Sequence, residues 1–167
     1  DMYGESISGI FKDQDIPGRP HIFAERNWHD SDAHMRCIMT DKYKFIVNTY
    51  THLPFPITGD YFYSEAWNDL LENHENNSLS AAQKRIFEFP RPSVELYDIQ
   101  KDPHEVNNLS IYPEYKDLMT KLNNELIRWQ ADTNDSLAAP VPRRDIVDRK
   151  SGYLHDIQRL KKLSEEF

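Results

Sequence analysis

The sequence predicts an α+β fold in which a four-stranded antiparallel sheet packs against a long C-terminal helix. Three observations predict it: strand-forming runs at 21–27 and 36–50, a further run at 95–100, and one long helical pattern after Pro113. Short strands joined by tight turns pair most simply as antiparallel neighbours. A helix with one apolar stripe needs an apolar surface to cover. We therefore expect this helix to lie across the sheet.

The first three strands are predicted from short apolar runs. The first contains His21-Ile22-Phe23-Ala24. The second and third contain Cys37-Ile38-Met39 and Phe45-Ile46-Val47, with a hairpin turn at Asp41-Lys42. Because side chains alternate between the two faces of a strand, either Ile38 or its two neighbours face the core.

The segment between the third and fourth strands is predicted to form a structured loop and two short helices. Residues 51–63 are rich in proline and aromatic side chains and have no clear period. Ser64 and Ser80 can cap helices over 65–74 and 81–88, because a serine hydroxyl accepts a hydrogen bond from a first-turn amide. The main helix has apolar residues at three- and four-residue steps, namely Tyr115, Leu118, Met119, Leu122, Leu126 and Trp129.

Residues 136–167 are predicted to form an extended tail with a terminal helix. Prolines limit the connector over 138–144 to extended conformations. Residues 153–167 carry Leu and Ile at helical steps, which predicts an amphipathic helix.

The run from Glu95 to Leu109 carries the most specific motif of the chain. Its pattern is L-Y-D-x-x-x-D-P-x-E-x-x-N-L, and it resembles the C-terminal signature of the type I, formylglycine-dependent sulfatases. Residues 35–46 are similar to paired strands of that family, and residues 22–25 to the strand before them. The opening residues 1–6 match a D-x-x-G-x-S segment that follows the family's catalytic domain.

Within this family the chain is most similar to the heparan N-sulfatases (N-sulfoglucosamine sulfohydrolases). The likeness is concentrated in Pro54-Phe55-Pro56-Ile57, Asp60-Tyr61-Phe62-Tyr63 and Trp67-Asn68-Asp69-Leu70-Leu71. Arg128-Trp129-Gln130 and Thr133-Asn134-Asp135 add to it. The resemblance implies that residues 21–135 are the sulfatase C-terminal α+β subdomain of an alkaline-phosphatase-like fold. Residues 1–20 would then connect it to a preceding catalytic domain.

The resemblance also implies hydrolysis on a formylglycine nucleophile with calcium holding the sulfate. The formylglycine motif is C/S-x-P-x-R, whereas the only cysteine, Cys37, is followed by Ile38-Met39-Thr40. Unpaired cysteine behaves as a small apolar residue, and we expect Cys37 to point into the sheet interior. We therefore expect no catalytic residue and no cofactor in this chain, which would be inactive without the N-terminal catalytic domain of the same protein.

Composition limits the partners and the compartment. With 28 acidic and 20 basic residues the formal net charge is −8, which argues against a nucleic-acid binder, because phosphate contacts need a basic face. No apolar run is long enough for a transmembrane helix. A single cysteine excludes an internal disulfide framework. Family members are exported, so the resemblance implies a periplasmic, extracellular or lysosomal location. Three glycosylation sequons begin at Asn76, Asn108 and Asn134.

A polar segment from Arg26 to Arg36 lies between the first two strands and is expected to be a loop. In related sulfatases the loop at this position contacts the sugar, and His29 and Asp30 match a His-acidic pair of the N-sulfatase pattern. We predict substrate-binding roles for His29, Asp30, Arg36 and Trp28. Imidazole and carboxylate groups bond sugar hydroxyls, guanidinium holds anions in bidentate fashion, and indole can stack on a sugar face. In the alternative interpretation Arg36 pairs with a nearby carboxylate and Trp28 is buried.

Two other clusters of titratable residues are given non-catalytic interpretations. His29, Asp30, Asp32 and His34 could suggest a metal site, but no cysteine or helical H-x-x-x-H spacing supports one, and we predict none. Asp98, Asp102 and Glu105 are expected to brace the turn of the signature and not to act in acid-base chemistry.

These observations predict the C-terminal part of a sulfuric ester or sulfamate hydrolase. Its substrate is expected to be N-sulfated glucosamine of heparan-type glycans, with this chain shaping one side of the substrate pocket. One alternative within the class is an O-sulfatase or a phosphate or phosphonate ester hydrolase. An alternative of another class is a non-enzymatic interaction module that uses the sheet edge or the terminal helix.

Overall fold

The computed structural model describes residues 8–9, 11–12 and 18–135. Most of the predicted connector over 1–20 lies outside this part of the chain, including the segment 1–6. The predicted tail, with its connector over 138–144 and its terminal helix over 153–167, also lies outside it.

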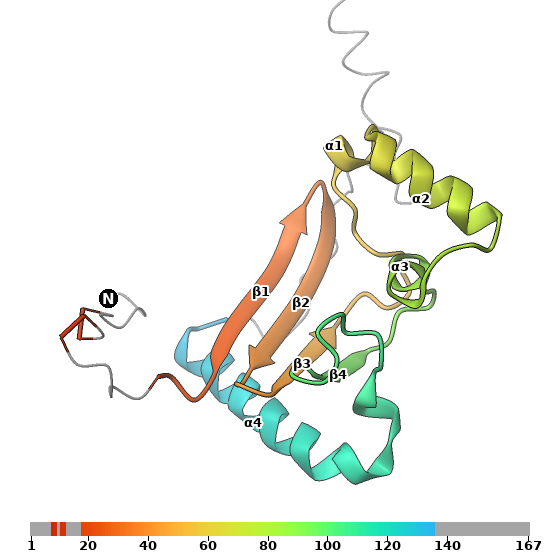
Figure 1. Cartoon of the computed structure of the whole chain (residues 1–167). Coiled ribbons are helices and arrows are strands. Elements are labelled where there is room, and N and C mark those ends of the chain that lie inside the picture. The colour runs from red at the N-terminus through yellow and green to blue at the C-terminus, as the bar shows by residue number, and fades with distance from the viewer. Residues whose placement is uncertain (1–7, 10, 13–17, 136–167) are drawn as a thin grey trace, which may run out of the picture.

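A four-stranded sheet confirms the predicted fold class (Figure 1). Its strands are β1 (Ile22–His29), β2 (Ser31–Met39), β3 (Tyr43–Asn48) and β4 (Val94–Asp98). They lie in chain order, and each pair of neighbours is antiparallel. Thr40 closes the β2–β3 turn, where its Oγ1 accepts a hydrogen bond from Tyr43 N at 2.8 Å.

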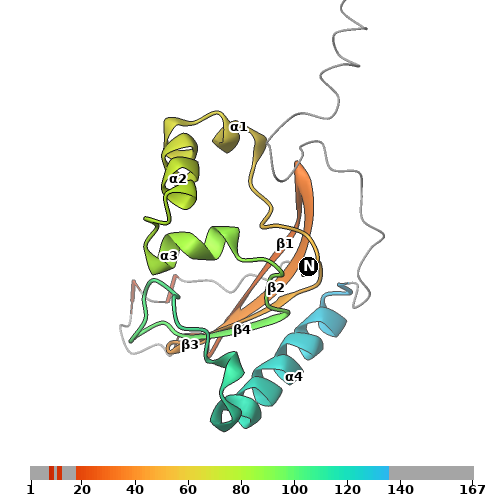
Figure 2. The same ribbon diagram turned by 90° about the vertical axis from the view of Figure 1, so that its right-hand side faces the viewer.

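Helix α4 (Lys116–Asp132) covers one face of the sheet and forms the main core with it (Figure 2). The short 3₁₀ turns η2 (Leu109–Ile111) and η3 (Pro113–Tyr115) lead from β4 into this helix. Ile38 is fully buried against α4. Of the two predicted alternatives along β2, it is therefore Ile38 that faces the main core, and not Cys37 with Met39. The predicted apolar stripe is confirmed, with Trp129 stacked on Phe23 at a centroid distance of 4.9 Å.

Cys37 therefore points to the opposite face, where it is half-buried and not part of the main core. Burial raises the pKa of its thiol to about 11. The thiol is protonated at neutral pH, and a protonated thiol is a poor nucleophile.

The other side of the sheet carries the segment between β3 and β4 (Figure 2). This segment contains α1 (Gly59–Phe62), α2 (Glu65–Glu75), α3 (Ala81–Lys84) and the 3₁₀ turn η1 (Arg85–Phe87). A second apolar cluster holds these helices together; it contains the buried Phe62, Trp67, Leu70 and Leu79.

Both predicted helix caps are confirmed. Ser64 Oγ accepts a hydrogen bond from Trp67 N at 3.1 Å, and Ser80 forms a capping box with Gln83. The predicted helix over 81–88 is only partly correct, because the α-helix ends at Lys84 and continues as η1. Residues that precede a proline avoid the helical region, and Phe89-Pro90 follows directly. Residues 51–63 are likewise not wholly a loop, because α1 forms at their end.

The contrast between Leu126 and Ile127 tests this packing. Leu126 is 1% exposed in the main core, whereas the adjacent Ile127 is 42% exposed. Leu126→Ala is expected to lower the free energy of unfolding by about 2–5 kcal/mol, because it leaves a cavity. Ile127→Ala serves as the control, because it also shortens an aliphatic side chain of α4 to alanine, and its loss should be much smaller. Equal losses in denaturant unfolding would contradict the assigned helix face.

Candidate functional site

The polar segment between the first two strands is a tight hairpin, not the predicted loop. β1 and β2 remain paired to their ends, where His29 faces Ser31, and Asp30 alone forms the connection. Asp30 has a φ of 56°, which Asp adopts more readily than most residues because its short side chain bonds locally. The register shifts between the pairs Arg26–Met35 and Trp28–Asp32, so β2 has one more residue than β1 there, and His34 within it has a φ of 37°.

Asp30 ties the hairpin tip to the start of helix α1. Its Oδ2 accepts a hydrogen bond from Gly59 N at 2.8 Å. The same oxygen lies 3.3 Å from His29 Nδ1. The structure therefore brings together the predicted pair His29 and Asp30, and it adds a segment 29 residues away in sequence. Figure 1 shows α1 beside the β1–β2 tip.

The side chains at the tip differ in exposure. His29 is 62% exposed at its side chain, whereas Asp30 is 27% exposed. Trp28 is 39% exposed, so it is not the buried indole of the alternative interpretation. The imidazole and the indole are open to a ligand, and the carboxylate holds the tip in place.

Arg36 lies apart from the tip in a buried ion pair. It is 4% exposed, and its Nε and Nη2 donate to Asp135 Oδ2 and Oδ1 at 2.6 and 2.8 Å. Its Nη1 donates to the Met35 carbonyl at 2.9 Å. Gln130 donates to the same carboxylate at 3.0 Å. The pairing of Arg36 with a carboxylate agrees with the alternative interpretation, and a substrate contact for Arg36 stays a prediction.

His34 and Asp135 also belong to the network around Arg36. The sequence did not predict that either residue would contact Arg36. His34 Nδ1 lies 2.7 Å from Thr49 Oγ1, and its Nε2 lies 3.5 Å from Arg36 Nη2. Burial, together with the Arg36 charge, lowers the pKa of His34. The imidazole is therefore neutral near pH 7. No local signal links Arg36 to Asp135, since they are 99 residues apart.

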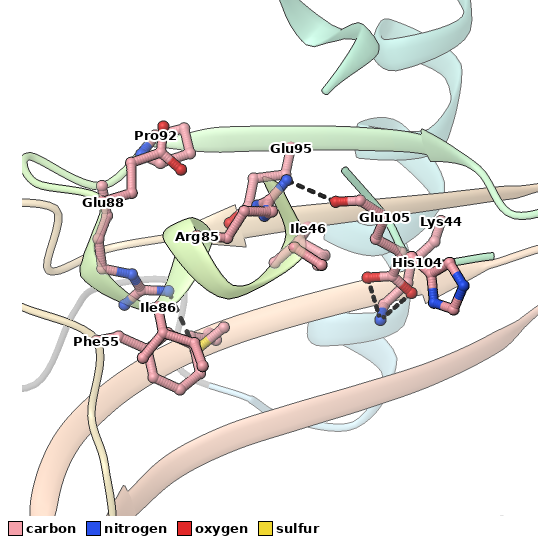
Figure 3. Close-up of a pocket in the computed structure, with 13 residues that line it drawn as sticks. Lys44, Ile46, Phe55, Arg85, Ile86, Glu88, Pro92, Glu95, His104 and Glu105 are labelled. Carbon is pink, nitrogen blue, oxygen red and sulfur yellow. Dashed lines mark hydrogen bonds and ion pairs between the residues drawn. The ribbon is translucent and has the colours of Figure 1, made fainter. Parts of the chain in front are cut away.

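A second polar cluster lies on the other face of the sheet, around a cavity of about 330 Å³ (Figure 3). Glu95 accepts hydrogen bonds from Arg85, Tyr97 and Asn48. Burial raises the pKa of Tyr97 well above its ordinary range, so its phenol stays protonated and donates.

Lys44 reaches this cavity from β3 (Figure 3). Its Nζ lies 2.9 Å from both carboxylate oxygens of Glu105. Four of the charged groups that line the cavity form two ion pairs within the protein, Lys44 with Glu105 and Arg85 with Glu95. This arrangement fits a structural role better than acid-base chemistry.

The signature turn is braced as predicted. Asp102 accepts from Val106 N at 3.1 Å and Asn107 N at 2.7 Å, and Asp98 Oδ1 accepts from Lys101 N at 3.1 Å. These bonds replace backbone partners that a turn leaves unsatisfied.

Asn108 and Ser110 close the outer edge of β4. Asn108 Oδ1 accepts from Leu96 N at 3.0 Å, and its Nδ2 donates to the Val94 carbonyl at 3.3 Å. Ser110 Oγ donates to the same carbonyl at 2.9 Å. The amide of the sequon at Asn108 is thus used within the fold.

The described part of the chain shows neither a group of metal ligands nor a membrane-spanning helix. No group of three or more His, Cys, Asp or Glu side chains there could hold a metal ion. No helix there has the length and apolar character of a membrane span.

Known sulfatases are similar to this chain over most of its length. The chain is 29% identical to the human N-sulphoglucosamine sulphohydrolase over 117 residues, which cover 68% of this chain and 23% of that protein. It is 26% identical over 150 residues to an ulvan-active sulfatase of Formosa agariphila, covering 89% of this chain and 24% of the relative. The chain thus spans about a quarter of the length of these relatives. No family model matches it.

A solved structure, of a 2-O GAG sulfatase, shares the fold. It aligns with a TM-score of 0.53 and 16% sequence identity over 86% of this chain and 23% of that chain. This likeness concerns the fold: the sheet and α4 form an α+β architecture that this part of the solved sulfatase structure shares.

The Arg36–Asp135 pair can be tested by stability. Asp135→Ala leaves a buried guanidinium without its partner, and breaking one side of a buried ion pair costs about 3–5 kcal/mol. We expect a loss of that size in the free energy of unfolding. Glu125→Ala is the control, because it removes the exposed pair with Arg128 and should cost less than about 1 kcal/mol. Similar losses for the two variants would contradict a buried, stabilising pair.

The same pair predicts a pH dependence. The hydrogen bond from Arg36 is the main cause that lowers the pKa of Asp135 in the folded protein. A depressed carboxyl pKa contributes stability that is full above the unfolded value of about 3.9 and is lost as pH falls through the folded pKa. The stability difference between the wild type and Asp135→Asn should therefore shrink as pH falls below about 4. Denaturant unfolding across this range measures it, and a difference that stays constant would refute the assignment.

Proposed function

Because the chain is a homologue of the sulfatases along most of its length, we propose that it forms the C-terminal part of a sulfatase that removes N-sulfate from glucosamine residues of heparan-type glycans. The similarity to the human N-sulphoglucosamine sulphohydrolase is the observation that carries this proposal. The proposed substrate agrees with the exposed His29 and Trp28 at a rigid hairpin tip.

The chemical step is assigned to the rest of the protein. The described residues offer no ligand set for calcium, and the sequence has no C/S-x-P-x-R motif for formylglycine. The described residues therefore do not fit calcium, and no position of the sequence fits formylglycine. We propose that the N-terminal catalytic domain of the same protein supplies both, and that this subdomain closes one side of the substrate pocket. A location outside the cytoplasm, in the periplasm, the lysosome or the extracellular space, is part of the proposal.

The proposed roles at the tip follow from its geometry. The His29 imidazole is exposed and can exchange hydrogen bonds with a sugar hydroxyl or a sulfamate oxygen. Trp28 offers an apolar ring beside it. Asp30 acts through its bond to Gly59, as the residue that fixes where the imidazole lies. Arg36 is a further predicted substrate contact. Its guanidinium is paired with Asp135, so it would have to bond Asp135 and the substrate at the same time.

A second candidate is an O-sulfatase. It is favoured by the ulvan-active sulfatase, which covers 89% of this chain against 68% for the N-sulphoglucosamine sulphohydrolase. A phosphate or phosphonate ester hydrolase remains a further alternative of the same class. A non-enzymatic interaction module is the alternative of another class, and activity of the full-length protein separates it from the others.

The experiment is a sulfate-release assay of the full-length protein on N-sulfoglucosamine, 6-O-sulfated glucosamine and an aryl sulfate. We expect release from the N-sulfated sugar, and about a 3- to 10-fold lower kcat/KM on that substrate for His29→Ala, the size of one lost hydrogen bond. His104→Ala, which changes an exposed histidine of the signature turn, should leave it unchanged. Activity confined to O-sulfates would favour the second candidate, and no activity on any substrate would refute an enzymatic role.

A further inference from the structure

Exposed aromatic side chains of a second segment lie next to the hairpin tip. We propose that Tyr61 and Tyr63, with the hairpin tip, form a second sugar-binding subsite that takes the unit adjacent to the sulfated sugar. The inference rests on the proposed function and deepens it, because it makes the substrate an oligosaccharide and not a single sugar.

A direct bond places α1 at the tip. Gly59 N donates to Asp30 Oδ2 at 2.8 Å, so the first residue of α1 is in contact with the residue that connects β1 and β2. A helical residue advances only about 1.5 Å along the axis. Tyr61 and Tyr63 follow this contact by two and four residues in the chain. Figure 1 and Figure 2 both show α1 next to the end of the hairpin.

The two tyrosines are exposed although they flank a buried residue. Tyr61 is 38% and Tyr63 66% exposed, whereas Phe62 between them is 7% exposed and packs in the second apolar cluster. Phe62 thus anchors the segment and turns its neighbours outward. With Trp28, the hairpin and the α1 segment bear three exposed aromatic rings.

The platform is held rigidly before any ligand binds. The Tyr61 ring packs edge-on against Trp67 at a centroid distance of 5.9 Å. The Tyr61 carbonyl accepts hydrogen bonds from Ser64 Oγ at 2.7 Å and Ser64 N at 3.0 Å. A surface that is already ordered loses little conformational entropy when it binds.

The residue types suit a sugar. Tyrosine and tryptophan offer a flat apolar face with a polar edge at low conformational cost, and a pyranose ring has an apolar face of C–H groups and a rim of hydroxyls. Asp60, exposed between Gly59 and Tyr61, adds an acceptor for hydroxyls. A side-chain hydrogen bond with Thr58 is the main cause that lowers the pKa of Asp60, so this carboxylate is ionised at neutral pH.

The test compares two substrates on the full-length protein: the N-sulfoglucosamine monosaccharide and a heparan tetrasaccharide that begins with the same sugar. Tyr63→Ala is the informative variant, because Tyr63 is exposed and its truncation leaves no cavity in the core; thermal unfolding checks that the variant is folded. We expect kcat/KM to fall about five- to tenfold on the tetrasaccharide, the loss of one stacking contact, and to stay unchanged on the monosaccharide. Tyr63→Phe should keep the wild-type preference.

Tyr112→Ala is the matched control, since Tyr112 is 40% exposed next to η2, away from α1. A loss of equal size on both substrates, or no loss on either, would overturn the subsite while leaving the proposed function intact. If the wild type releases no sulfate from either substrate, the proposed function fails. Titration with heparan and ulvan oligosaccharides then decides the subsite separately: weaker binding by Tyr63→Ala supports it, and equal binding or none overturns it.

Discussion

The buried pairing of Arg36 with Asp135 is the interaction on which the arrangement of the site depends. Arg36 lies in β2, the strand that continues into the hairpin tip, and Asp135 follows the end of α4. A buried guanidinium is costly unless a carboxylate meets it with good geometry. The bidentate contact satisfies this requirement, and it fixes the end of α4 against the strand that carries the site. The Phe23–Trp129 stack supports the same junction with apolar contact.

The two faces of the sheet bury different kinds of side chain. Toward α4 the buried residues are mostly apolar and supply the free energy of burial. On the other face, Glu95, Arg85 and Tyr97 bring charges and a phenol out of water and satisfy them with one another. A half-satisfied network of this kind would be worse than an apolar surface. This need accounts for the contacts of Glu95 and Tyr97, at the start of the run from Glu95 to Leu109, with other groups of the protein.

The sequence predicted those features that depend on near neighbours. Period-two and period-3.6 patterns identified the strands and α4, and serine positions identified the caps at Ser64 and Ser80. The hairpin at Asp30 was mistaken for a loop, because polar residues along β1 and β2 hide a ladder that continues past a register shift as far as His29 and Ser31. The bond between Asp30 and Gly59, and the pair of Arg36 with Asp135, join residues far apart in the chain. Their partners depend on the tertiary fold, which no local pattern contains.

The side chains at the outer edge of β4 have a consequence for aggregation. Asn108 and Ser110 occupy the Val94 carbonyl and the Leu96 amide that would otherwise accept a strand from another molecule. The β1 edge is protected differently, by charged residues such as Glu25. Charge repulsion is screened by salt, whereas occupied hydrogen-bonding groups are not. Intermolecular strand pairing at high ionic strength should therefore begin at β1, while β4 stays closed to it.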